Sequence, residues 1–265
     1  MGLAPLAAAL ALAVSPVAFV QSSQGPDGGF TEANGKPDAT LTSWAVLGLR
    51  AAGSDAPGAL AYLQSQEAGL QTIADVSLTA LAEEALGAHP DALTARIKAA
   101  EQPSGQIGET LNSTYWAVLA LDAAPAATVH FILAHQTKAG GWSWGAGVQA
   151  DSNDTAAALE ALRVAGVKGA PVTRGVKFLL TFENKDGGFE LSHGRGSDAQ
   201  STAWAIQGLL AAGKTPPHAA FHYLGTLRRP DGSYRYSAKY VTTPVWVTSQ
   251  VLAALAKKTF PLGGV

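Results

Sequence analysis

A short turn motif recurs along the chain, and this repetition limits the fold more than any other feature of the sequence. Its clear copies are Gln24-x-x-x-Gly28-Gly29-Phe30, Gln136-x-x-x-Gly140-Gly141-Trp142, Glu183-x-x-x-Gly187-Gly188-Phe189 and Arg228-x-x-x-Gly232-Ser233-Tyr234. Weaker copies lie around Gly69 and Gly105. The glycines then recur about every 35–47 residues, which is the length of one helix-turn-helix unit. The sequence therefore predicts six repeats, each a pair of helices.

Each predicted repeat carries the same signals around its turn. A proline predicts the start of the first helix, because the missing N–H costs nothing in the first helical turn; these are Pro16, Pro57, Pro90, Pro125, Pro171 and Pro217. The second helix contains a threonine in register, at Thr42, Thr79, Thr114, Thr155, Thr202 and Thr248. Four residues earlier stands an acid that we interpret as a helix N-cap, at Asp38, Asp75, Asp151 and Asp198. These features keep one register, which supports the repeat.

The two helices of each repeat differ in polarity. The second helices are apolar on almost every side, as in residues 203–210, so they must be buried. The first helices are amphipathic: Val176 and Leu179 share a turn with Arg174 and Lys177. The arrangement that satisfies both is an all-α toroid, an α6/α6 barrel with the apolar helices inside. Closure into a ring also explains why no repeat has the polar outer face of a capping repeat.

The N-terminus indicates export. Residues 1–13 are apolar and uncharged, and they are typical of a signal peptide that is cleaved after Ala13. Such a cut leaves Ser15 as an N-cap ahead of Pro16. We therefore expect residues 14–265 to form a single toroid domain in a secreted or extracytoplasmic protein, with no stable membrane span after cleavage. The alternative is that residues 1–13 anchor the protein, although the apolar run is short for a membrane span.

Composition excludes several classes of function. Lys and Arg number 18 against 20 Asp and Glu, so the chain has no basic surplus that would favour nucleic acid. It contains no cysteine, which excludes disulfides, thiolate nucleophiles and cysteine-ligated zinc. His218 and His222 are spaced as a metal pair, but two ligands without a third indicate a solvated helix face. We expect no metal and no cofactor.

The turn motifs resemble those of the prenyltransferase and squalene-oxidase repeat superfamily. The segment from Gln136 to Trp142 has the Q-x-x-x-G-x-W form typical of triterpene cyclase repeats, and the other turns are looser versions. The resemblance covers the chain after Ser15 and implies the α/α-toroid fold. It does not specify an activity, because this fold carries unrelated functions.

The segment from Asp151 to Ala156 resembles the Asp-x-Asp-Asp-Thr-Ala motif of class II terpene cyclases. In that family the middle aspartate protonates an alkene, and here its position holds Asn153, whose amide cannot supply the proton. The flanking Asp151 and Asp154 remain as candidate catalytic residues. The simpler interpretation is that Asp151 only caps a helix.

Other activities of the superfamily lack their residues or domains. The resemblance implies a zinc site with a cysteine ligand in protein prenyltransferases and a Gly-Cys-Gly-Glu-Gln motif in thioester domains, and neither can be built from this chain. A class II cyclase or a cobalamin carrier would require a second domain.

Four tryptophans lie near the register threonines: Trp44, Trp116 and Trp204 follow them by two residues, and Trp246 precedes the last by two. Residues two apart lie on nearly opposite sides of a helix, so either the threonine row or the tryptophan row faces the ring centre. Tryptophans that face inward would form an aromatic mouth for an apolar or carbohydrate ligand. Tryptophans that face outward would only pack the core.

We therefore expect an exported toroid that binds an apolar or other small ligand, or a partner protein of the cell envelope, in its central pocket without catalysis. Candidate binding residues are Asn153, Asp198, Trp44, Trp116, Trp204 and Trp246. One alternative is a cyclase- or transferase-like enzyme that uses Asp151 and Asp154 on isoprenoids. Others are a carbohydrate-active toroid, with Glu83 or Glu84 paired with Asp75 or Asp151, and a structural envelope module.

Overall fold

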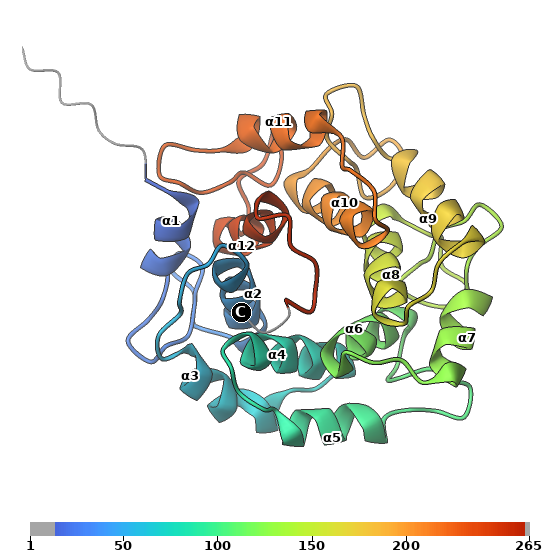
Figure 1. Ribbon diagram of the computed structural model, residues 1–265. Helices are drawn as coiled ribbons and strands as arrows, with labels where there is room; N and C mark the ends of the chain where they lie inside the picture. The colour runs from blue at the N-terminus through green and yellow to red at the C-terminus, as the bar shows by residue number, and fades with distance from the viewer. Residues whose placement is uncertain (1–13, 263–265) are drawn as a thin grey trace, which may run out of the picture.

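The computed structural model describes residues 14–262, which fold into a closed ring of helices in two layers (Figure 1). The inner layer consists of α2 (Ala39–Ala51), α4 (Ile73–Ala85), α6 (Leu111–Leu121), α8 (Ser152–Val164), α10 (Ala199–Ala211) and α12 (Pro244–Leu255). The outer layer consists of α1 (Pro16–Ser22), α3 (Ala59–Gln66), α5 (Asp91–Ala99), α7 (Ala126–Ala134), α9 (Ala170–Leu180) and α11 (His218–Leu227). A short 3-10 helix, η1 (Glu67–Gly69), follows α3. The predicted all-α toroid is confirmed, and the predicted signal peptide lies outside the described residues.

The ring closes where the last inner helix packs against the first. Each inner helix contacts the next one along the chain, and α12 contacts α2. The backbones of these two helices approach closely, since a Cβ on Gly48 would lie 2.4 Å from the carbonyl oxygen of Ser249. The carboxylate of Glu32 accepts hydrogen bonds from the backbone N–H groups of Val245 (3.1 Å) and Trp246 (2.9 Å). The first repeat thus supplies the N-terminal cap of the last inner helix.

The turn motif ties each repeat to the next outer helix. The side chain of Gln136 donates to the carbonyl oxygens of Gly140 (2.7 Å) and Pro171 (2.8 Å), so it bridges its own turn and the next outer helix. Gln24 makes the equivalent pair of bonds. Gly28 has a φ of 89°, and a Cβ there would lie 2.3 Å from the Gly58 carbonyl oxygen. The motif therefore encodes contact between neighbouring repeats as well as a turn.

The second repeat departs from the predicted pattern. Gly69 lies in η1 and lacks the left-handed conformation of the other motif glycines. The N-cap of α4 is Thr72, whose hydroxyl accepts from the N–H of Asp75 at 3.1 Å. The prediction that Asp75 is an N-cap was therefore wrong, because α4 begins almost a turn earlier than its equivalents. Asp38, Asp151 and Asp198 do cap their helices.

The prolines mark the starts of the outer helices less exactly than their pattern predicted. Pro16 and Pro171 lie in the first turn of α1 and α9. Pro90, Pro125 and Pro217 occupy the N-cap position instead, and Pro57 comes just before the N-cap of α3. Within residues 14–262, no helix is both long enough and apolar enough to cross a bilayer.

Candidate functional site

Every register threonine except Thr79, whose hydroxyl contacts that of Ser43, faces the turn of its own repeat. The hydroxyl oxygen of Thr42 accepts from the backbone N–H of Phe30 at 2.9 Å, and that of Thr155 accepts from Trp142 at 3.0 Å. The same bond joins Ile107 to Thr114, Phe189 to Thr202 and Tyr234 to Thr248. The helix face two residues further on therefore points toward the ring axis. The tryptophan row, and not the threonine row, therefore faces the ring centre.

Three indole rings meet at the ring centre. Trp44 from α2, Trp116 from α6 and Trp204 from α10 have ring centroids 5.5, 5.9 and 5.6 Å apart, in edge-to-face contacts. None of the three is more than 7% exposed. Trp246 lies beside them, 6.3 Å from Trp44. Edge-to-face packing is a favourable arrangement for aromatic rings. We call Trp44, Trp116 and Trp204 the indole layer; it divides the interior of the ring into two halves.

The half toward the C-terminal ends of the inner helices is occupied by the chain itself. After α12 the backbone turns back into the ring (dark red in Figure 1). Phe260 is fully buried, with its ring 6.2 Å from that of Trp44. Its N–H donates to Glu160 at 2.6 Å, and its carbonyl oxygen accepts from the Arg163 guanidinium at 2.6 Å. This half of the ring is closed.

The other half contains a pocket of about 310 Å³ at the N-terminal ends of α6, α8 and α10. We call it the mouth pocket. It is lined by Asn112, Trp116, Trp144, Asp151, Asn153, Asp154, Ala157, Leu191 and Trp204. The structure thus brings together the cyclase-like segment and two of the predicted tryptophans.

Two carboxyl groups lie at the edge of the mouth pocket. Asp151 caps α8 and accepts from the backbone N–H of Asp154 at 2.8 Å. Asp154 accepts from the side-chain amide of Asn112 at 2.6 Å. Burial, followed by the charge of Asp151, raises the pKa of Asp154, although the bond from Asn112 lowers it. Asp154 therefore keeps its proton to a higher pH than an ordinary aspartic acid does, beside the Asp151 carboxyl group.

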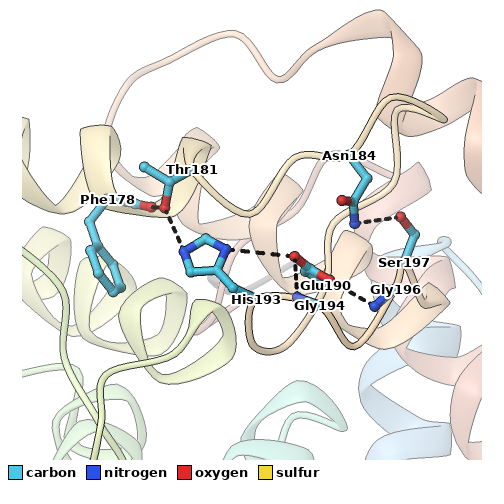
Figure 2. Close-up of polar contacts among 8 residues, drawn as sticks. All are labelled: Phe178, Thr181, Asn184, Glu190, His193, Gly194, Gly196 and Ser197. Carbon is cyan, nitrogen blue, oxygen red and sulfur yellow. Dashed lines mark hydrogen bonds and ion pairs between the residues drawn. The ribbon is translucent and has the colours of Figure 1, made fainter.

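One wall of the mouth pocket is a loop held by its own polar contacts (Figure 2). Glu190 accepts from the backbone N–H groups of Gly196 (2.7 Å) and Gly194 (3.1 Å), and it faces His193 at 3.6 Å. Burial would raise the pKa of Glu190, but these hydrogen bonds outweigh burial and lower it. Leu191 follows directly and lines the pocket, which fixes that wall.

Other predicted residues lie elsewhere. Asp198 caps α10, accepting from the Ser201 N–H at 2.7 Å, and borders a separate cavity of about 690 Å³ with Arg195 and Tyr236. That cavity is larger than the mouth pocket, but none of the predicted tryptophans lines it. Glu83 is buried in α4. Burial and the neighbouring Glu67 raise its pKa to about 7. Residues 14–262 contain no cluster of three His, Asp or Glu side chains that could hold a metal.

Sequence reasoning missed four residues of the mouth pocket. Ala157 lies four residues after Asn153 on the same face of α8. Asn112 lies four residues before Trp116 and so shares its inward face, which the helical period could have indicated. Trp144 and Leu191 lie in loops between a turn and the following inner helix, where no periodicity applies. Their positions are set by backbone bonds: the Asn112 N–H donates to the Trp144 carbonyl, and the Ser152 N–H to that of Leu191.

Comparison with solved structures places this fold among terpene cyclases and prenyltransferases. The type II terpene cyclase MstE from Scytonema matches with a TM-score of 0.68 and 18% identity, over 91% of this chain and 96% of that chain. The expectation that a class II cyclase requires a second domain was therefore wrong. A protein from Actinoplanes matches with a TM-score of 0.69 and 17% identity, over 91% and 97%. Candida albicans protein geranylgeranyltransferase-I, complexed with GGPP, matches with a TM-score of 0.60 and 12% identity, over 82% and 83%.

No family model matches the sequence, and no curated protein matches it. The structural neighbours therefore establish the fold of the chain, the terpene cyclase- and prenyltransferase-like α/α toroid, and the sequence resemblance to this group is confirmed at the level of fold.

Proposed function

We propose that this protein binds a small, mostly apolar ligand in the mouth pocket and does not catalyse a cyclisation. The observation that carries the proposal is the indole layer, because three side chains from alternate inner helices fill the ring centre. The space left for a ligand is the mouth pocket, whose 310 Å³ lies at the small end of ligand pockets, which hold about 300–1,000 Å³. An isoprenoid alcohol of monoterpene size suits this space better than a long polyprenyl chain.

The polar groups of the pocket favour a ligand with one hydrogen-bonding group. Trp116, Trp204 and Leu191 offer apolar surface. The carboxyl group of Asp154 and the amide of Asn153 offer hydrogen bonds on one side. Such a pocket orients a molecule that is apolar over most of its length and carries a hydroxyl or carbonyl oxygen at one end.

The same groups argue against the cyclase alternative. Protonation of an alkene requires a strong acid. Burial raises the pKa of Asp154, which makes it a weaker acid than an ordinary aspartic acid, and Asn153 has no acidic proton. Asp151 is engaged as the cap of α8. A cyclase among the neighbours, MstE, has been crystallised with geranylgeranyl dihydroxybenzoate, but this chain shares only 18% identity with it.

We further propose that the protein is exported, with cleavage after Ala13. The support is the apolar run of residues 1–13 and the start of the fold, where Ser15 accepts from the Ala18 N–H at 3.0 Å as the cap of α1. Mass spectrometry of the mature protein should find an N-terminus at Val14; an intact Met1 would contradict export.

Tryptophan fluorescence tests ligand binding directly, because two tryptophans of the indole layer line the pocket. Geraniol should quench the signal saturably, and Ala157→Leu, which fills the pocket from α8, should abolish the effect. Ala61→Leu on the exposed face of α3 is the matched control and should bind normally. Equal quenching in the wild type and in Ala157→Leu would refute the site. In a parallel assay with geranylgeranyl diphosphate and squalene, any cyclised product would refute the non-catalytic role.

A further inference from the structure

The segment that closes the second half of the ring is held by a specific contact rather than by apolar packing alone. The backbone of Phe260 is bound on both sides: its N–H donates to the carboxyl group of Glu160, and its carbonyl oxygen accepts from the Arg163 guanidinium. Both side chains come from α8, so the inner layer provides a built site for the segment.

Glu160 occupies a position that is polar in some repeats and apolar in others. It lies five residues after its register threonine. The first, third and sixth repeats have Leu47, Leu119 and Ala253 there, and the second and fifth have Glu84 and Gln207. Glu160 is fully buried, and one of its oxygens has no hydrogen-bond partner among the described residues. A buried carboxyl group destabilises a fold unless something binds it. The hydrogen bond from the Phe260 N–H is therefore the interaction that offsets the cost of burying Glu160.

Phe260 is linked to the mouth pocket through one side chain. Its ring contacts Trp44, and Trp44 in turn contacts both Trp116 and Trp204, which line the pocket. Trp44 has Phe260 on one side and the pocket walls on the other. Without the Phe260 ring, the Trp44 indole has room to move away from the pocket.

We propose that residues 258–262 are a built-in ligand of the ring, and that Phe260 sets the depth of the mouth pocket by holding Trp44 in place. Phe260 then limits the length of the ligand that the mouth pocket can bind. The ligand preference rests on the proposed function, whereas the anchoring of the segment does not.

The first experiment measures ligand length in the full-length chain. Wild type should bind farnesol no more tightly than geraniol, because the indole layer blocks the extra isoprene unit. Phe260→Ala should bind farnesol about tenfold more tightly than wild type does, since the longer chain gains buried methylene groups. Phe178→Ala, the same substitution on outer helix α9, is the control and should keep the wild-type preference. An unchanged preference in Phe260→Ala would overturn the role in ligand length.

The second experiment tests anchoring without any ligand. Lys258 is exposed and precedes the buried Phe260, so trypsin should release residues 259–265 slowly from wild type. Glu160→Leu places the residue of the first and third repeats at this position, so the ring should still fold. This variant should release the segment at least about tenfold faster, while its circular dichroism stays unchanged.

Equal release rates in wild type and Glu160→Leu would overturn the anchoring. If wild type binds no prenyl alcohol but Glu160→Leu does accelerate release, the proposed function fails and the built-in ligand stands.

Discussion

Glu32 should contribute more to the free energy of unfolding than an ordinary surface glutamate does, because it joins the first repeat to the last. The N-cap of α12, Thr243, contributes no side-chain hydrogen bond, and the N–H groups of Val245 and Trp246 are bound by the Glu32 carboxylate instead. Replacing Glu32 with alanine leaves both donors without this partner and removes a negative charge from a helix N-terminus.

The size of the loss follows from these contacts. Hydrogen bonds to a charged group contribute about 1.5–3 kcal/mol each when buried. A charge at a helix N-terminus adds about 0.3–1 kcal/mol. Because Glu32 is half-buried and water can replace part of the interaction, we expect Glu32→Ala to lower the free energy of unfolding by about 2 kcal/mol. Glu32→Gln keeps one acceptor oxygen and should lose about 1 kcal/mol.

Urea unfolding followed by circular dichroism measures this difference. The matched control is Glu109→Ala, an exposed glutamate in the loop before α6, which should change stability by less than about 0.5 kcal/mol. If Glu32→Ala is no less stable than Glu109→Ala, the ring is closed by helix packing alone and the capping argument is wrong.

Three further predictions concern pH and the turns. Burial raises the pKa of Glu160 to about 8, so the native state keeps a proton that the unfolded state releases above about pH 4.5. The free energy of unfolding should therefore fall as pH rises from 5 to 8. Urea titrations at each pH should show this fall in wild type and a smaller one in Glu160→Gln. The pKa of Glu190 in the folded protein is lower than its ordinary pKa of about 4.3. The hydrogen bonds that Glu190 accepts are therefore present above pH 4.3 and are lost as pH falls through the pKa of the folded protein. Hydrogen exchange of the Gly194 and Gly196 amides should report this loss in wild type and not in Glu190→Gln. Gly28→Ala should destabilise by more than about 2 kcal/mol in thermal melts, because its Cβ would collide with a backbone carbonyl, whereas Gly69→Ala has open space and should be neutral.

The repeats were predictable because three independent signals kept one register. The turn glycines, the threonines and the acids each recur at the same interval, and closure of the ring follows from inner helices that are apolar on every side. The same property hid the orientation of the tryptophans, since a helix buried all round gives no polar face as a reference. Only the bond from the Phe30 N–H to Thr42, and its equivalents, shows which side faces the axis.

The repeat pattern could not predict that the segment around Phe260 fills part of the ring interior. The segment around Phe260 follows the last helix and matches no motif, and its place depends on two side chains of α8, about a hundred residues earlier in the chain. Asp75 was assigned wrongly because a single repeat began its helix at Thr72. In both cases a contact specific to one repeat overrides the pattern shared by the others.

A crystal structure with a bromine-labelled geraniol analogue would show whether the mouth pocket binds a small apolar ligand, since the anomalous signal of bromine locates the ligand without ambiguity. We expect one bromine site inside the mouth pocket, against the exposed edges of Trp116 and Trp204, with the ligand hydroxyl within hydrogen-bond distance of Asp154 or Asn153 and the indole layer in place. Bromine on the far side of Trp44, beside Phe260, would refute the proposed site, and so would a ligand bound only in the cavity beside Asp198.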